Sequence, residues 1–284
     1  MGGIGNQLFC YFAGYHLSQK NRTDLEIDAT AIKKNIMLNQ STIKDLGLSG
    51  NFMFNSRDGF NKNLHRILRR LNLFIPSLYK ITKYYSNTEI GFDANLELLR
   101  SPVIIDGYFQ SYKYVNPYID QIRPLKLQNK SKWLSEIEHE LSELSFLAIH
   151  VRRGDYSNLT DTFGLLSLEY YLNGIRLARE FGCTGPLVVF SDELDVARKM
   201  LSESIGESVY WIDPPLSSPP IESLYLMSLA QCVIIANSTF SWWAATLSKD
   251  NSIVFAPSKW FRNKQDPSCL IPPHWKIIDS KWID

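Results

Sequence analysis

The second half of the chain alternates between short apolar runs and longer segments with helical periodicity. The apolar runs have the length of buried strands and lie at residues 146–149, 186–190, 209–213, 232–236 and 253–256. Between them, apolar residues share one helical face at residues 167–175, 195–201, 221–231 and 239–247. This alternation of strand and helix predicts a parallel, doubly wound α/β sheet, in which residues 253–256 form the last strand.

The first half begins with a glycine-rich turn, residues 2–9, that leads into a helix. Glycines before a helix allow backbone N–H groups to approach an anion; the alternative is a flexible terminus that caps an ordinary helix. A turn of this kind normally follows a strand, so we expect that the first strand is missing or that the chain begins at an internal Met. The apolar face of the helix consists of Leu8, Tyr11, Phe12 and Tyr15.

Two further strands and a linker are predicted before the alternating half. Residues 25–28 and 103–106 have the composition of strands, and the second leads into an aromatic loop that ends at Gln110. Pro124 and the polar stretch that follows it indicate a linker. We therefore predict an N-terminal domain over residues 1–128 and a C-terminal domain over residues 129–284, which suits a chain of 284 residues.

The composition argues against several classes of partner and site. The net charge of +1 gives no broad field to attract nucleic acid or an anionic membrane, so any anion site must be local. The four cysteines show neither a C-x-x-C motif nor metal-ligand spacing, and two lie in apolar runs as small hydrophobic residues, which favours a reducing compartment. Because the chain has no apolar run of about 20 residues and no secretory leader, we expect a cytoplasmic protein.

Residues 62–83 combine basic side chains with Leu and Ile in an amphipathic pattern. The ordinary interpretation is a solvated helix face. The sharper alternative is a contact with an acceptor or with the inner face of a membrane.

Polar residues follow three of the predicted strands. In a parallel sheet these ends lie on one edge, where ligands bind. Arginine suits phosphate oxygens, a carboxylate suits the paired N–H donors of guanine, and the start of a helix suits phosphate. Each group also has an ordinary explanation as a helix cap or a solvated turn. The residues are His150, Arg152 and Arg153 after the first of these strands, Ser191, Asp192 and Glu193 after the second, and Asn237, Ser238 and Thr239 after the third.

Four blocks of sequence carry most of these residues. They read GGIGNQLF at 2–9, HVRRGDY at 150–156, FSDE at 190–193 and NSTFSWWAA at 237–245. Together, and in this order, they resemble the motif set of the α-1,2-fucosyltransferases of glycosyltransferase family 11. The resemblance implies a GT-B fold of two facing Rossmann-like domains, GDP-β-L-fucose as the donor, and inversion to an α-1,2 linkage.

The resemblance also implies roles for individual residues. Arg152 would hold the β-phosphate, and His150 and Asp192 would address the guanosine. A turn in the other domain would face the donor. Ser238, Thr239 and Ser241 would address the phosphates. The remaining donor-binding candidates are Gly3, Gly5, Asn6 and Gln7 in that turn, and Arg153, Ser191 and Asn237 at the strand ends.

The sequence contains no D-x-D motif. We therefore expect that Arg152 and Arg153 take the place of a metal ion at the departing diphosphate, and that no metal or other cofactor is needed. The base that accepts the proton of the acceptor hydroxyl group stays open between Asp155 and Asp161, so the catalytic candidates are Arg152, Asp155 and Asp161.

Two other functions remain as alternatives. The first is a non-catalytic protein that binds a sugar nucleotide or a glycan, and the second is a GT-B transferase with a different GDP-sugar donor. The expected acceptor is a galactoside or related glycan, as in O-antigen biosynthesis.

Overall fold

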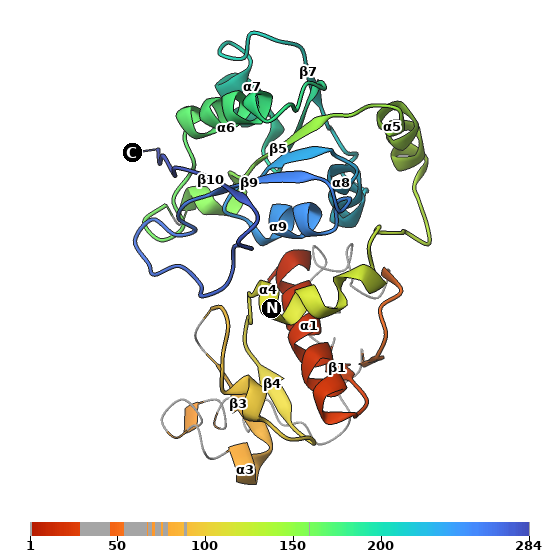
Figure 1. The fold of residues 1–284 in the computed structure, drawn as a ribbon, viewed down its shortest axis with the longest axis vertical. Coiled ribbons are helices and arrows are strands. Elements are labelled where there is room, and N and C mark those ends of the chain that lie inside the picture. The colour runs from red at the N-terminus through yellow and green to blue at the C-terminus, as the bar shows by residue number, and fades with distance from the viewer. Residues whose placement is uncertain are drawn as a thin grey trace. The chain divides into compact units, whose positions relative to one another are not determined.

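The structure is a computed structural model that describes residues 2–28, 46–53, 67, 70–71, 75, 79–87, 90–158 and 160–283. The chain forms two compact units (Figure 1). Unit 1 comprises residues 1–118 together with the short segment 267–270, and unit 2 comprises residues 119–266 and 271–284. The sequence placed the boundary later, at residue 128, and did not assign a C-terminal segment to the first unit.

Unit 2 is built on a six-stranded parallel sheet with the order β10-β9-β8-β5-β6-β7. Numbered along the chain, this is the strand order of the Rossmann fold, in which the direction of winding reverses between β5 and β8. The strands are β5 (Leu147–Val151), β6 (Leu187–Ser191), β7 (Val209–Trp211), β8 (Cys232–Ile234), β9 (Ile253–Pro257) and β10 (Lys276–Ile278).

Helices pack on the sheet and bury its central strands. β5 is buried at every position because it lies between β6 and β8 with helices over the sheet, and a strand covered on both faces reads as a continuous apolar run. The main core joins β5, β6 and β8 to α6 and α7. The helices of this unit are α5 (Lys132–Ser142), the 3-10 helix η6 (Gly154–Asn158), α6 (Leu168–Glu180), α7 (Leu194–Leu201), α8 (Pro220–Ser228) and α9 (Thr239–Thr246).

The sequence correctly predicted the strand and helix alternation up to β9 but was wrong about the last strand. β10 follows β9 and pairs with it in parallel at the edge of the sheet. Only one of its three residues, Ile278, is buried. An edge strand this short has no apolar run, so its place in the sheet comes from the backbone pairing with β9.

Unit 1 contains two parallel strand pairs, β1 with β2 and β3 with β4, in its described residues. The core gathers Ala13 and Leu17 of α1 against Tyr85, Leu96 and Tyr114. The elements are α1 (Ile4–Asn21), β1 (Glu26–Asp28), β2 (Asn51–Met53), α3 (Tyr79–Thr82), β3 (Tyr84–Ser86), η4 (Leu96–Leu98), β4 (Ile104–Asp106), α4 (Tyr112–Val115) and η5 (Asn116–Gln121), which runs across the boundary between the units.

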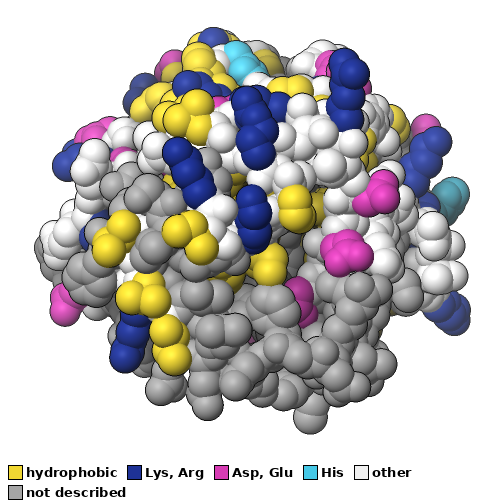
Figure 2. Space-filling model, turned by 90° about the horizontal axis from the view of Figure 1, so that it is seen from below, with side chains coloured by type: hydrophobic (Ala, Val, Ile, Leu, Met, Phe, Trp, Pro, Cys, Tyr) yellow, Lys and Arg dark blue, Asp and Glu magenta, His cyan; other side chains and the backbone are white. Residues whose placement is uncertain are grey.

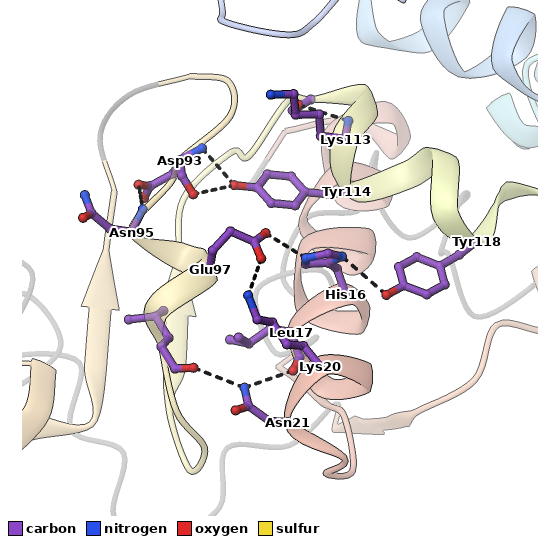
Figure 3. Close-up of polar contacts among 12 residues, drawn as sticks. His16, Leu17, Lys20, Asn21, Asp93, Asn95, Glu97, Lys113, Tyr114 and Tyr118 are labelled. Carbon is purple, nitrogen blue, oxygen red and sulfur yellow. Dashed lines mark hydrogen bonds and ion pairs between the residues drawn. The ribbon is translucent and has the colours of Figure 1, made fainter.

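A polar network fastens α1 to the rest of unit 1 (Figure 3). The Glu97 carboxylate accepts from Lys20 Nζ at 2.5 Å and pairs with His16 Nε2 at 2.8 Å. Tyr118 Oη lies 3.4 Å from the other ring nitrogen of His16. Burial raises the pKa of Glu97, but the contacts with Lys20 and His16 outweigh it and lower the pKa. The network ties α1 to η4 and η5, and so gives the N-terminal helix a fixed position in its unit.

Cys183 and Cys232 form a disulfide between the end of α6 and the start of β8. The cysteine pattern led us to expect a reducing compartment, and it gave no indication of this disulfide. The two cysteines are 49 residues apart, and only the packing of α6 on the sheet brings them together. Cys10 and Cys269 are free. Within the described part of the chain, no helix combines the length and the apolar character needed to cross a membrane.

We predict that Gly185→Ala destabilises unit 2 strongly. A Cβ at this position would lie 1.4 Å from the backbone oxygen of Ser145, so the loop before β6 would have to move. We expect a loss of at least about 2 kcal/mol in the free energy of unfolding, measured by urea denaturation. Gly206→Ala is the matched control because its Cβ would meet nothing within 4 Å. Equal stability of the two variants would contradict the prediction.

Candidate functional site

The polar residues of the three strand ends meet at the carboxyl edge of the sheet in unit 2. β5 and β8 are neighbours there, and the chain winds away from them in opposite directions. In open α/β sheets this switch point forms the crevice in which ligands bind. His150 and Val151 end β5, and Val151 is paired in register with Ser191 at the end of β6.

The centre of the site is an ion pair between Arg152 and Asp192. Arg152 Nη1 lies 2.8 Å from Asp192 Oδ2, and both side chains are about one-quarter exposed, with 24% and 25% of their surface accessible. Asp192 Oδ1 accepts the backbone N–H of Arg153 at 2.9 Å. Asp192 therefore links the end of β6 to the residues that follow β5, and it fixes one side of the Arg152 guanidinium.

Gly154 makes this arrangement possible. A Cβ on Gly154 would lie 2.2 Å from Asp192 Oδ2, inside contact distance. The absence of a side chain lets the carboxylate pack directly against the turn after β5. This close approach explains, on steric grounds, why a glycine occupies this position of the HVRRGDY block.

Tyr156, in η6, connects this ion pair to the end of β8. The Arg152 guanidinium lies over the Tyr156 ring, with Cζ 5.1 Å from the ring centroid. Tyr156 Oη donates to the backbone oxygen of Asn237 at 3.1 Å, and its ring stacks on Phe163 with centroids 4.5 Å apart. All three strand ends are thereby joined by direct contacts.

His150 is a buried, neutral imidazole. Burial lowers the pKa of His150 to about 3, and the positive charge of Arg152 acts in the same direction. The ring lies 5.4 Å from that of Phe240, and Nδ1 has no hydrogen-bond partner within the described structure. A side chain of this kind can exchange hydrogen bonds with a ligand, but it is a poor proton acceptor at neutral pH.

The N-terminus of α9 completes the edge. Ser238 is its N-cap, and its hydroxyl accepts the backbone N–H of Phe240 at 3.3 Å. Backbone N–H groups and the helix dipole at such a terminus favour an anion. Thr239 is half-buried at the first position of the helix. The edge thus brings a guanidinium, a neutral imidazole and a helix N-terminus together, a combination suited to a nucleoside diphosphate.

Comparison with known proteins shows the family of the chain. A family model described as Glycosyl transferase family 11 matches residues 72–276. The chain belongs to glycosyltransferase family 11. It is 28% identical to an alpha-1,2-colitosyltransferase of Escherichia coli over 98% of this chain and 97% of that protein. It is 26% identical to the O-antigen biosynthesis glycosyltransferase WbnK of Escherichia coli over 92% and 93% of the two chains.

A solved structure supports the fold. The fucosyltransferase NodZ from Bradyrhizobium matches with a TM-score of 0.53 and 16% identity over 87% of this chain and 90% of that chain. The family 11 chain is therefore a glycosyltransferase with the α/β, GT-B type fold that the sequence predicted. Members named galactoside 2-alpha-L-fucosyltransferase are more partial relatives, such as the Caenorhabditis elegans protein, 28% identical over 62% of this chain and 53% of that one.

Several predicted site residues serve the fold in this family 11 chain. Arg153 is 4% exposed and donates to the backbone oxygen of Leu166 at 2.8 Å and to Met200 Sδ at 2.6 Å. The Asn237 amide donates to the backbone oxygens of Phe163 and Trp260. Ser241 is fully buried and bonds backbone oxygens at the start of α9. Their polar atoms are thus engaged by the protein itself, which leaves Arg152 as the predicted arginine that reaches the surface of the edge.

The other predicted residues at this edge are Ser191 and the two candidate bases, Asp155 and Asp161. Ser191 Oγ accepts the backbone N–H of Glu193 at 3.1 Å and shapes the turn after β6. Asp161 is exposed on the following loop, where its backbone oxygen accepts from Asn263 Nδ2 at 2.8 Å. The side chain of Asp155 lies outside the described residues.

The predicted residues of the glycine-rich turn lie at the start of α1 in unit 1. Gly3 is the N-cap of the helix and Gly5 lies buried in its first turn. Asn6 Oδ1 accepts from Gln110 Nε2 at 2.7 Å. Gln7 is 1% exposed, and its Nε2 donates to the backbone oxygen of Gly2 at 3.4 Å. The predicted helix is present but begins at Ile4, so Gly5, Asn6 and Gln7 lie in its first turn and not in a turn before it.

Two aromatic residues of the site were not singled out from the sequence. Tyr156 contacts Arg152 and Phe240 contacts His150. Both lie inside the blocks that carry the family resemblance, so the sequence could have indicated them as site residues. It could not have predicted which residues they contact, because that depends on the folded arrangement of the strand ends.

We predict that His150 makes the protein less stable in acid. Its pKa is lower in the folded state than the value of about 6.5 in an unfolded chain, so only the unfolded chain takes up this proton as the pH falls. The free energy of unfolding should therefore fall between about pH 7 and pH 4, with a contribution from His150 that approaches about 1.4 kcal/mol per pH unit.

The test compares urea denaturation of His150→Gln with that of the wild type across this pH range. The variant should show the shallower loss of stability. His139→Gln removes an exposed imidazole from α5 and should keep the slope of the wild type. Identical slopes for all three proteins would contradict a buried neutral His150.

Proposed function

We propose that this family 11 chain transfers L-fucose from GDP-β-L-fucose to the 2-hydroxyl group of a galactoside or related glycan, with inversion at the anomeric carbon. The observation that carries the proposal is the Arg152–Asp192 pair beside the N-terminus of α9 at the switch point of the sheet. The site suits the diphosphate of a sugar nucleotide. The family membership and the relatives named fucosyltransferase support the sugar and the linkage.

The residues have distinct tasks in this reaction. The acceptor oxygen attacks the anomeric carbon while the bond from that carbon to the β-phosphate oxygen breaks. Negative charge grows on the departing GDP, where the Arg152 guanidinium and the α9 N-terminus stabilise it. His150, neutral at the working pH, contributes hydrogen bonds to the nucleotide. Asp155 and Asp161 are the candidates for the base that takes the acceptor proton.

The proposal includes transfer without a metal ion. Arg152 supplies positive charge at the place where a metal ion would otherwise stabilise the diphosphate.

Two further functions compete with fucosyl transfer. One is colitosyl transfer, which the Escherichia coli relative favours because it matches 98% of this chain. Colitose is fucose without its 3-hydroxyl group, so both donors present the same diphosphate. The other is binding of a sugar nucleotide without turnover.

We predict that GDP is released from GDP-fucose in the presence of a galactoside and excess chelator. The product should carry an α-1,2 linkage, identified by NMR. Arg152→Ala should lower kcat/KM by about 100-fold or more, since a charge-stabilising donor is lost. Arg176→Ala, an exposed arginine of α6 paired with Glu180, should retain the wild-type rate.

The competing functions give different results in the same assay. Faster turnover of GDP-colitose than of GDP-fucose would assign the colitosyl donor. Binding of GDP-fucose without release of GDP, with a panel of galactosides, would show a non-catalytic protein. An absolute requirement for Mg²⁺ or Mn²⁺ would contradict the proposed role of Arg152.

We also propose that unit 1 contacts an anionic membrane surface. The side chains that the structure describes between positions 67 and 83 are exposed and either apolar or basic, and the sequence has no acidic residue between Asp58 and Glu89. Figure 2 shows hydrophobic side chains interspersed with Lys and Arg on one face. Apolar side chains beside cations suit an anionic bilayer. The residues are Ile67, Arg70, Leu71, Ile75, Lys80, Ile81 and Lys83; the rest of the predicted amphipathic segment 62–83 falls outside the described side chains.

We predict cosedimentation with phosphatidylglycerol vesicles but not with phosphatidylcholine vesicles. Lys80→Glu combined with Lys83→Glu should weaken binding by at least about tenfold, because each basic residue near the surface contributes about 1 kcal/mol. Ile81→Ser removes the most exposed of these apolar side chains, 81% accessible, and should also weaken it. Leu216→Ser, at a fully exposed position of unit 2, and Lys264→Glu are the controls. Equal binding by all variants would exclude this surface.

A further inference from the structure

The Arg152 guanidinium is held from two directions by residues of different elements. Asp192, after β6, pairs with Nη1 at 2.8 Å. The ring of Tyr156, in η6, lies under the guanidinium with its centroid 5.1 Å from Cζ. The carboxylate fixes the direction of the N–H groups, and the ring fixes the plane in which they lie.

Tyr156 is itself held in place by a hydrogen bond and by ring stacking. Its hydroxyl donates to the backbone oxygen of Asn237 at 3.1 Å, and its ring stacks on Phe163 at 4.5 Å. The Asn237 amide, 1% exposed, bonds the backbone oxygens of Phe163 and Trp260. The anchor therefore reaches from the end of β8 through Tyr156 to Arg152, and it consists of hydrogen bonds and ring contacts within unit 2.

We infer that Tyr156 is a positioning residue for Arg152. An arginine side chain has many rotamers, and ordering them at the moment of reaction would raise the barrier. The Tyr156 ring keeps the guanidinium at the sheet edge before the donor binds. This inference rests on the proposed role of Arg152 in charge stabilisation and assigns a further residue to it. In this role Tyr156 acts on the reaction by positioning Arg152 and does not contact the substrate.

The tyrosine hydroxyl explains why the position suits Tyr better than another aromatic residue. A phenylalanine would keep the face for the guanidinium but lose the bond to Asn237 at the end of β8. A leucine would lose both. The two substitutions therefore separate the contribution of the anchor from that of the ring.

The test is rescue of Arg152→Ala by free guanidinium ion, read as fucosyl transfer. Guanidinium at millimolar concentration should restore part of the lost rate by occupying the place between Asp192 and Tyr156. Adding Tyr156→Leu to Arg152→Ala should weaken this rescue by about tenfold, because the ring no longer holds the cation. With Arg152 intact, Tyr156→Leu should lower kcat/KM by about tenfold.

Tyr170→Phe is the matched control. The Tyr170 hydroxyl also donates to a backbone oxygen, that of Ile235 at 2.7 Å, but Tyr170 belongs to the core under α6. In the Arg152→Ala background it should leave the guanidinium rescue unchanged. If Tyr156→Leu does not fold, Tyr156→Phe replaces it, and rescue should then require a higher guanidinium concentration than in the Tyr170→Phe control.

The outcomes separate this inference from the proposed function. Equal rescue with and without the Tyr156 ring would overturn the positioning role alone. If guanidinium rescues neither background, the double-mutant cycle decides: strictly additive losses for Arg152→Ala and Tyr156→Leu overturn the inference, and coupled losses support it. Full activity of Arg152→Ala would overturn the proposed function of the site and the positioning role with it.

Discussion

The organisation of the site depends on one carboxylate. Asp192 accepts the backbone N–H of Arg153 with one oxygen and pairs with the Arg152 guanidinium with the other. It thereby fixes the turn after β5 to the end of β6, at the point where the sheet reverses its winding. Gly154 is needed because a side chain there would occupy the place of this carboxylate.

Charge at this edge is distributed between two neighbouring arginines with different tasks. Arg153 is buried and donates a hydrogen bond to the backbone oxygen of Leu166, so it stabilises the turn after β5. Arg152 stays partly exposed, with a carboxylate on one side and an aromatic ring below. Burial lowers the pKa of the neighbouring His150, and the positive charge of Arg152 acts in the same direction. The edge can therefore hold an anion near one well-placed cation without accumulating several charges in the interior.

The sequence predicted the fold of unit 2 well because its elements are local patterns. Buried parallel strands read as apolar runs, and helices read as repeated apolar faces. The edge strand β10 escaped detection because only Ile278 of its three residues is buried. The disulfide between Cys183 and Cys232 escaped for another reason, since the spacing of two distant cysteines carries no information about the packing of α6 on the sheet.

By itself, the sequence determined the α/β class, the family resemblance and the three polar strand ends, because residue type and local spacing encode them. Only the tertiary structure decided which of those side chains bond to the protein itself and which stay partly exposed at the edge. It turned Arg153, Asn237 and Ser241 inward to satisfy backbone oxygens, and it placed Tyr156 against Arg152. The physical reason is that a side chain's partners lie on other strands, and the direction in which it points is set by contacts that the order of residues along the chain does not contain.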